Sequence, residues 1–437
     1  MPSLLEPPVQ TCPQNYFVSN YPPFSCWSAD KTPKLLHALS RPAKAGPLGL
    51  YVHLPFCRQR CHYCYFRVHP QPKRHEVDRY IDCLLAELEM YRKFPALQLR
   101  GFDSVYFGGG TPSFAEVDQI ERLFRGLQAR TGWDAVEECT FECEPGTVTP
   151  EKLRALKNSG VTRLSLGFQT LDDEVIRRNG RRGTKEECRR SFERARLAGF
   201  DQINIDLLAG LPGETEESWQ DTIHEVLDLA PDCITIYQLE LTYNSTLYYS
   251  IQGGRNVSLP SWPIKRQWVK DAFEACEQMG YTIGSGYMAI RDPAHWRFVY
   301  TVEHFWHGAD LVALGETAFG HIQGVHYQNA DTYEEYCATV AAGRLPIRRA
   351  YLLNSEEKFR REVILQLKTG ALDADHFRKK FDIDLADRFE PQFKELLEEG
   401  LLEIDGNSIR LTREGLLEVD WLLPRFYLSN HVGIRYT

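Results

Sequence analysis

The sequence predicts an α/β protein built on a parallel sheet, because short apolar runs alternate with amphipathic helical segments. Six candidate strands and five candidate helices take turns between residues 48 and 239. Two of these helices end at Gly160 and Gly199, which are typical stop signals. Strands joined by helices must run parallel, since each connection crosses over the sheet. Six such units favour an open (β/α)6 partial barrel over a closed barrel of eight.

The expected strands are short and rich in apolar residues. They are Leu48–His53, Ser104–Phe107, Glu138–Cys143, Arg163–Gly167, Gln202–Leu208 and Cys233–Leu239. The expected helices carry apolar residues at a spacing of three and four. They are Val77–Phe94, Val117–Gln128, Glu151–Ser159, Thr184–Ala198 and Glu216–Leu229. Together these elements predict a barrel domain over residues 47–245.

Different patterns flank this domain on both sides. Residues 1–46 are rich in proline and aromatic residues, with a helix expected only at Lys34–Leu39, and are predicted to be an arm that wraps the main body. Residues 246–350 lose the alternation except for a helix at Ile264–Met279. We expect this segment to extend the sheet or to form a lid over a substrate.

The last segment, residues 351–437, is helical and charged. Three helices and a hairpin are expected, at Glu356–Leu367, Ala374–Phe381, Pro391–Glu399, and Leu401–Ile404 with Ile409–Thr412. This order is typical of a winged-helix domain. Such domains often bind DNA, but glutamates give this one an acidic face, so packing against the main body is the better prediction.

Composition excludes several classes of protein. The chain has 437 residues, 43% hydrophobic and 25% charged, which indicates a globular protein of about two to three domains. The formal net charge is −9 and no basic block is present, so nucleic acid is not an expected partner. No run of apolar residues is long enough for a membrane span and no signal peptide is recognisable, which predicts a cytoplasmic location.

Cysteine spacing gives the clearest chemical signal. Twelve cysteines are too few for a disulfide scaffold in a chain of this length, but three follow the first strand as C-x3-C-x2-C. These are Cys57, Cys61 and Cys64. Three thiolates leave one iron of a [4Fe-4S] cluster open to a small molecule. The alternative is a zinc knuckle completed by a nearby histidine, for which the candidates are His53, His62 and His69.

Two further motifs follow the next strands. Gly108, Gly109 and Gly110 after the second strand allow backbone groups to approach a ligand closely, although a tight turn explains a triple glycine equally well. Glu142 and Glu144 end the third strand two residues apart, so both point to the same face. Without further context, they could be ordinary surface residues.

The segments LYVHLPFC, GGGTPS and IDLLAGLPGET, together with Tyr63 before the third cysteine, resemble radical S-adenosylmethionine enzymes of the oxygen-independent coproporphyrinogen III oxidase family. The resemblance runs from about Tyr16 to Tyr427 and is most specific in the barrel. It implies a partial barrel and a [4Fe-4S] cluster whose open iron is chelated by S-adenosylmethionine. One electron then cleaves the sulfonium and releases a 5'-deoxyadenosyl radical.

The resemblance also implies roles for particular residues. The glycines and Thr111 match the segment that binds the methionine amino group, and Glu142 matches a residue that contacts S-adenosylmethionine close to the substrate, so it is the expected catalytic residue. The other positions expected to contact the cofactor are Tyr63, Gln169, Arg181 and Asp206. A guanidinium suits a methionine carboxylate, and the amide and carboxylate suit ribose hydroxyls.

One departure from the family affects the expected reaction. The decarboxylating members carry a further cysteine where this chain has Phe66, whereas the arm with NYPPF resembles the decarboxylases and methyltransferase-like members. The leading expectation is methyl transfer with a second S-adenosylmethionine. The alternatives are oxidative decarboxylation of coproporphyrinogen III and heme binding or delivery. Expected partners are a small-molecule substrate of the tetrapyrrole class and an electron donor such as flavodoxin or ferredoxin.

The remaining cysteines and histidines have more ordinary expected roles. Most cysteines fall on apolar faces and are predicted to lie in the core, while Cys12 and Cys26 in the arm are minor candidates for ligands or radical relays. A group of histidines and a tryptophan in the segment after the barrel is expected to line a substrate pocket. Its members are His295, Trp296, His304, His307, His321 and His326.

Overall fold

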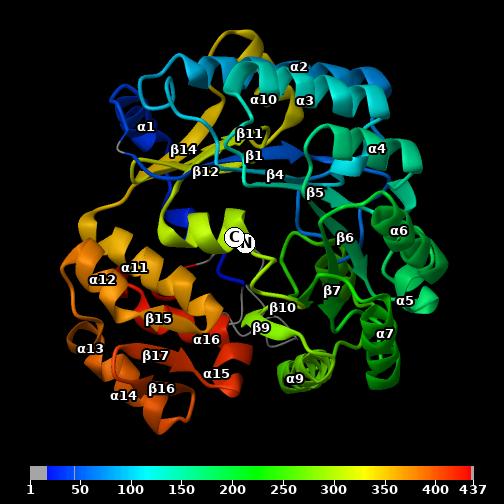
Figure 1. Cartoon of the computed structure of the whole chain (residues 1–437), viewed down its shortest axis with the longest axis vertical. Helices are drawn as coiled ribbons and strands as arrows, with labels where there is room; N and C mark the ends of the chain where they lie inside the picture. Colours follow the sequence, from blue (N-terminus) through cyan, green and yellow to red (C-terminus); the bar gives the residue numbers. More distant parts are fainter. Residues whose placement is uncertain (1–16, 44, 435–437) are drawn as a thin grey trace.

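One twelve-stranded sheet forms the body of the computed structural model, which describes residues 17–43 and 45–434. Its strand order is β14-β13-β12-β11-β1-β4-β5-β6-β7-β8-β10-β9. Figure 1 shows the sheet curving around the centre of the molecule, with most helices on its outer side and the C-terminal elements facing its inner side. The predicted α/β class with a mostly parallel sheet is therefore confirmed.

The six expected strands lie side by side in the predicted parallel arrangement. They are β1 (Leu48–Leu54), β4 (Ser104–Gly109), β5 (Glu138–Cys143), β6 (Arg163–Gln169), β7 (Gln202–Ala209) and β8 (Cys233–Gln238). The helices between them are α2 (Arg74–Arg92), α3 (Val117–Thr131), α4 (Pro150–Asn158), α6 (Lys185–Leu197) and α7 (Glu216–Leu229). The sequence reasoning missed the short α5 (Asp173–Arg178), because six residues are too few to show a helical period.

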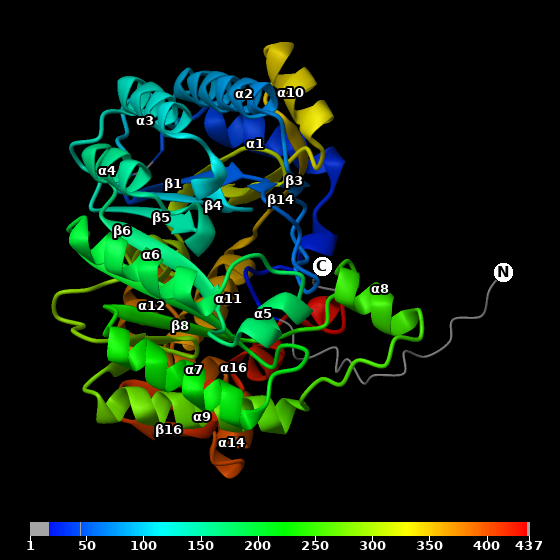
Figure 2. The same ribbon diagram turned by 90° about the vertical axis from the view of Figure 1, so that its right-hand side faces the viewer.

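Residues after the barrel add strands to both edges of the sheet (Figures 1 and 2). Beyond β8 lies β10 (Met288–Ile290), which is antiparallel to β8, and then β9 (Thr282–Ser285), which is antiparallel to β10. Beyond β1 lie β11 (Asp310–Leu314), which is parallel to β1, and then β12 (Phe319–Ile322), β13 (Val325–Asn329) and β14 (Ile347–Leu352) in antiparallel order. Because β14 belongs to this sheet and ends at Leu352, it crosses the boundary expected at residue 350.

Helices and short strands complete the main body. They are α1 (Thr32–Leu39), α8 (Thr246–Gln252), α9 (Trp262–Gln278), α10 (Tyr333–Ala341), and the two-residue strands β2 (Phe56–Cys57) and β3 (His69–Pro70). Among the described residues, none of the helices is long and apolar enough to cross a membrane.

The C-terminal unit has its own hydrophobic core. It contains α11 (Ser355–Gln366), α12 (Ala374–Phe381), α13 (Leu385–Arg388), α14 (Glu390–Glu398), α15 (Arg413–Leu417) and α16 (Val419–Leu422), with β15 (Ala371–Asp373), β16 (Leu402–Asp405) and β17 (Ser408–Leu411) forming a small antiparallel sheet. This is the helical domain that the sequence predicted, including its hairpin.

The arm and α15 fasten the C-terminal unit to the main body. Val18 and Tyr21 of the arm are buried in the C-terminal core, whereas Leu35 of α1 is buried in the core of the main sheet. On the other side, Lys270 of α9 forms an ion pair with Glu414 of α15, with 2.9 Å between nitrogen and oxygen. These contacts join the C-terminal unit to the main body.

Candidate active site

The cysteine loop begins where β1 ends, and its two ends are tied to each other. β2 and β3 pair in parallel, and the His69 amide donates to Pro55 O at 2.7 Å. Between these anchors the chain carries Cys57, Cys61 and Cys64, all of which line one central cavity. The loop therefore presents all three thiols to the same space.

These thiols fit an iron–sulfur cluster better than a single ion. Among the described residues, no three His, Cys, Asp or Glu side chains are already gathered around one metal position. A [4Fe-4S] cluster is wider than an ion, and each cysteine binds a different iron. Burial raises the pKa of Cys57 to about 12 and that of Cys64 to about 11, with the neighbouring cysteines adding to both shifts. A bound cationic centre would lower these pKa values and favour the thiolates.

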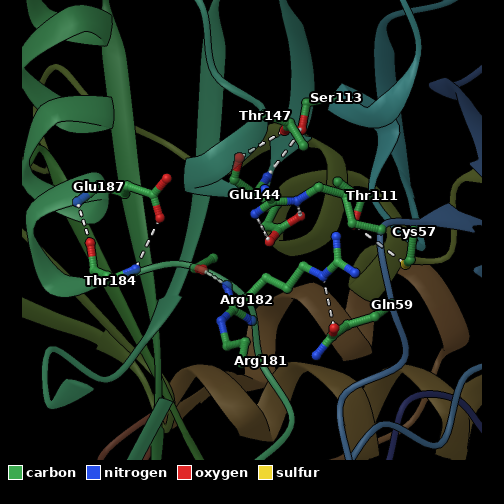
Figure 3. Close-up of polar contacts among 12 residues, drawn as sticks. Cys57, Gln59, Thr111, Ser113, Glu144, Thr147, Arg181, Arg182, Thr184 and Glu187 are labelled. Atoms are coloured by element: carbon green, nitrogen blue, oxygen red, sulfur yellow. Dashed lines mark hydrogen bonds and ion pairs between the residues drawn. The ribbon is translucent and has the colours of Figure 1, made fainter. Parts of the chain in front are cut away.

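A bidentate ion pair holds the cysteine loop against the barrel. Arg58 donates to Glu144 through Nε at 3.0 Å and through Nη2 at 2.6 Å. The Glu144 amide in turn donates to the Ser113 hydroxyl at 3.0 Å (Figure 3). Glu144 thus has a positioning role that links the cysteine loop to the segments that follow β4 and β5.

The glycine motif packs directly on the start of the cysteine loop. The Thr111 amide donates to Phe56 O at 2.7 Å, and its hydroxyl contacts Cys57 Sγ at 3.4 Å (Figure 3). A Cβ on Gly110 would lie 2.8 Å from Phe56 O, so a side chain there would push the loop away. Gly109 has a φ of +115°, which other residues rarely adopt. Gly109, Gly110 and Thr111 line the cavity.

Gly108 is the member of this motif that does not line the cavity. A Cβ there would instead meet Tyr106 Cε1 at 2.9 Å and Glu142 Oε1 at 3.0 Å. Its small size therefore makes room for these two side chains. Gly108 therefore contributes to the site indirectly, by leaving space for Tyr106 and Glu142.

Glu142 lies at the end of β5, inside the cavity wall. The Tyr106 hydroxyl donates to Glu142 Oε1 at 2.7 Å. Burial raises the pKa of Glu142 to about 7, and the charge of Asp206 adds to the shift, while the hydrogen bond from Tyr106 opposes it. Glu142 can therefore hold or release a proton near neutral pH, a perturbation that is common at functional sites.

The remaining expected cofactor contacts meet at the ends of β6 and β7. Arg181 donates to the Tyr63 hydroxyl at 3.2 Å and also to Gly167 O. Asp206 accepts hydrogen bonds from Ser165 Oγ and Asn204 Nδ2, both at 2.8 Å, and its pKa is raised by burial. These two hydrogen bonds fix the carboxylate in the wall.

Gln169 adopts an unusual backbone conformation at the last residue of β6. Its φ is +70°, a conformation that costs of order 1 kcal/mol for a residue other than glycine. The side chain lines the cavity. Backbone strain of this kind is concentrated at functional sites, so this feature is an additional signal that the sequence did not carry.

The cavity has a volume of about 470 Å³ and lies between the barrel mouth and the C-terminal unit. Tyr63, Glu142, Gln169, Arg181 and Asp206 all line it with the three cysteines. The sequence reasoning missed one part of its wall, residues 416–421 of the C-terminal unit. These residues are far from the barrel in the sequence, and nothing in their local pattern indicates a ligand site.

The histidine group does not line this cavity, contrary to the expectation. The described wall contains no histidine. His304 bonds Ser104, and His321 and His326 lie in β12 and β13, where Trp27 of the arm stacks on His326 with 5.0 Å between ring centroids. Burial lowers the pKa of His321 to about 4, so it is a neutral core residue. The added strands place these two rings at the far edge of the sheet.

The two arm cysteines also lack support as ligands. Cys26 does not line the cavity, and Cys12 lies outside the described residues. Cys83, Cys139, Cys188, Cys233 and Cys276 are buried as expected. Cys143 is buried too, although it touches the cavity wall.

Comparisons with known proteins agree with this site. Residues 51–226 match the model of the radical SAM superfamily, and residues 353–417 match that of the HemN C-terminal domain. The barrel, the three-cysteine loop and these matches define a radical SAM protein, a class that uses a [4Fe-4S] cluster and S-adenosylmethionine.

Similar sequences and one solved structure assign the chain to a particular family within this class. The chain is 30% identical to the heme chaperone HemW of Bacillus subtilis over 84% of this chain and 96% of that protein. It is 30% identical to the oxygen-independent coproporphyrinogen III oxidase of Escherichia coli over 85% and 83%. The solved structure of coproporphyrinogen III oxidase (HemN) from Escherichia coli superposes with a TM-score of 0.81 at 27% identity, covering 94% and 96%. The chain belongs to this HemN and HemW family.

Proposed function

We propose that the chain is an enzyme that removes a hydrogen atom from a small molecule of the tetrapyrrole class. The observation that carries the proposal is that one cavity joins the three cysteines, Glu142 and the C-terminal unit. When bound, the cluster and S-adenosylmethionine supply a 5'-deoxyadenosyl radical. The tetrapyrrole class is supported by the relatives, which are named for coproporphyrinogen and heme.

The residues of the cavity have distinct tasks in this proposal. Arg181 offers a guanidinium that would hold the methionine carboxylate, and Gln169 and Asp206 offer groups for ribose hydroxyls. Glu142, with Tyr106 behind it, holds a proton close to the reacting part of the cavity. Phe17 of the arm and residues 416–421 of the C-terminal unit form part of the cavity wall, and such cover reduces the contact of a reactive species with water.

Oxidation of the substrate is favoured over methyl transfer as the reaction type. Methyl transfer was the leading expectation from the sequence, but the relatives that cover most of the chain are oxidases and heme chaperones. Phe66 remains a difference from the decarboxylating members of the family. We therefore propose hydrogen removal as the first step on the substrate, and identification of the product then distinguishes decarboxylation from other oxidations.

Heme delivery is the second candidate, because the HemW relative of Bacillus subtilis is matched over 96% of its length. Protein ligands of heme iron are histidine, cysteine, methionine or tyrosine. The described wall of the cavity has neither histidine nor methionine, but it includes Cys143 and tyrosines such as Tyr237 and Tyr287. Product analysis, set against heme binding, therefore decides between the two candidates.

The electron donor is proposed to be an acidic carrier protein such as flavodoxin or ferredoxin. Residues 56–75, which contain the cysteine loop, include five lysines and arginines and no acidic residue, in a chain of net charge −9. Three of these cations, Arg58, Arg67 and Arg74, form ion pairs with acidic residues outside the segment, which leaves Arg60 and Lys73 outside these ion pairs. Complementary charge guides such partners together and makes their association dependent on salt.

The test is an anaerobic incubation of the reconstituted protein with dithionite, S-adenosylmethionine and coproporphyrinogen III or a cell extract. We expect 5'-deoxyadenosine and a tetrapyrrole product, with loss of carbon dioxide or hydrogen visible by mass spectrometry. Cys64→Ala is the control and should give neither. A product heavier by one methylene group would restore methyl transfer, and tight heme binding with no product would establish the carrier.

A further inference from the structure

The segment that follows β8 holds the middle of the cysteine loop. The Leu247 amide donates to His62 O at 2.7 Å, and Asn244 Nδ2 donates to Tyr65 O, also at 2.7 Å. Both acceptors are backbone carbonyls, and they belong to the residues that directly follow the second and the third cysteine. The loop is therefore fixed at its middle as well as at its two ends.

Arg60 is a cation that the same segment holds beside the third cysteine. Its Nη2 donates to Asn244 O at 2.8 Å and to Cys64 O at 3.1 Å. Both acceptors are uncharged carbonyls, and Arg60 forms no ion pair with a carboxylate among the described residues. The side chain is exposed and lines the cavity. Its positive charge is thus fixed in place without a negative partner.

Arg58 and Arg181 also lie beside the cysteine loop, but both have a negative partner in the proposed complex. Arg58 forms the bidentate pair with Glu144. Arg181 donates to the Tyr63 hydroxyl, and in the proposed function it holds the methionine carboxylate. The charge of Arg60 is not matched in this way.

The charge of Arg60 reaches the thiol of the third cysteine. Burial raises the pKa of Cys64, and the neighbouring Cys61 adds to this shift. The amide of Phe66 and the charges of Arg60 and Arg181 act in the opposite direction. A cation beside a sulfur favours its negatively charged form. The same attraction would act on any more negative centre bound at this sulfur.

A [4Fe-4S] cluster becomes more negative when it is reduced. One electron enters, supplied by the proposed carrier protein or by dithionite, and no bond forms or breaks in this step. A fixed cation stabilises the more negative state and so raises the reduction potential. Net charge, hydrogen bonds to the sulfurs and exposure to solvent all set this potential in proteins.

We propose that Arg60, held in place by Asn244, raises the reduction potential of the cluster bound at the three cysteines. The inference rests on the proposed function and deepens it, because it names how the chain prepares this site to accept an electron. Asn244 is a positioning residue: its side chain holds Tyr65 O, and its backbone carbonyl fixes the guanidinium.

An anaerobic redox titration of the reconstituted chain measures this potential without a carrier protein or S-adenosylmethionine. EPR spectroscopy follows the reduced cluster while dithionite lowers the potential in the presence of mediators. Arg60→Gln removes the charge and keeps a hydrogen-bond donor. At a fixed potential the ratio of reduced to oxidised cluster should fall by about three- to tenfold, and a tenfold fall corresponds to about 59 mV for one electron. The effect is modest because water screens an exposed charge.

Three further variants separate charge from structure. Arg60→Lys keeps the charge and should restore the potential of the natural chain. Asn244→Ala leaves the charge present but releases it, so the ratio should fall by about two- to threefold. Arg410→Gln is the matched control, because Arg410 is an exposed arginine on β17 that donates to Ser408 Oγ at 2.9 Å and does not line the cavity. It should leave the potential unchanged.

Iron and sulfide analysis shows which variants carry the cluster. If the natural chain carries none, the proposed function fails and the inference fails with it. If the natural chain and Arg60→Gln both carry the cluster and share one potential, the inference is refuted while the proposed function stands. Arg60→Lys behaving like Arg60→Gln would refute the role of charge. If Arg60→Gln loses the cluster, Asn244→Ala carries the test, and an unchanged potential there refutes the inference.

Discussion

Substituting Gly110 by alanine tests how the glycine motif controls the cysteine loop. The added Cβ would lie 2.8 Å from both Phe56 O and Pro55 C, and backbone atoms cannot turn aside as a flexible side chain can. The cysteine loop must therefore move by several tenths of an ångström. Overpacking of this kind typically costs about 1–3 kcal/mol. For a domain of about 150–250 residues this corresponds to a melting temperature about 2–12 °C lower.

The displacement should also reach the metal site. Thr111 contacts Cys57 next to this glycine, so a shifted loop moves one of the three thiols. We expect Gly110→Ala to bind less iron after anaerobic reconstitution and to form less 5'-deoxyadenosine. Iron and sulfide analysis and thermal unfolding of the purified chain measure the two effects separately.

Gly101→Ala is the matched control, because its Cβ would meet only Ala135 Cβ at 3.8 Å, an ordinary contact. It should keep the iron content and melting temperature of the natural chain. If Gly110→Ala behaves like this control, the close approach does not position the loop, and the reasoning is refuted.

Three further predictions concern the wall and the loop. Burial raises the pKa of Glu142 to about 7, so between about pH 4.5 and pH 7 its carboxyl is protonated in the folded chain and ionised in the unfolded chain. The free energy of unfolding that this group contributes therefore falls as pH rises through that range. Glu142→Gln should remove up to about 3 kcal/mol of this pH dependence in denaturant unfolding of the cluster-free chain, and an unchanged pH profile would contradict it. For the Arg58 and Glu144 pair, a double-mutant cycle with Arg58→Met and Glu144→Gln should give a coupling energy of about 1 kcal/mol, since both side chains are partly exposed. If the two substitutions change the free energy of unfolding additively, the pair does not hold the loop. Cys64→Ala should lose the visible absorption of the cluster and Cys276→Ala should retain it, and equal spectra would remove Cys64 from the ligand set.

Local pattern in the sequence determined the barrel and much of its mouth. The six strands were recognisable because each is a short apolar run between helices with clear ends, and parallel order follows from that alternation. Cys57 follows β1, and Glu142 and Asp206 lie in the C-terminal halves of β5 and β7, so their meeting at one edge follows from the same topology. The resemblance to a family then gave these positions their expected roles.

Contacts between distant segments decided the rest. Residues 416–421 reach the cavity only because the arm and α9 hold the C-terminal unit over the barrel mouth, and no local pattern carries that information. The same holds for His326, which was expected in a pocket but lies under Trp27 because β13 joins the far edge of the sheet. Hydrophobic burial is proportional to area and not directional, so pattern shows that a face is buried without showing what covers it. Only the tertiary structure places Gln238 and Glu240 in the same cavity wall as residues 416–421 of the C-terminal unit, where Gln238 donates to Leu417 O.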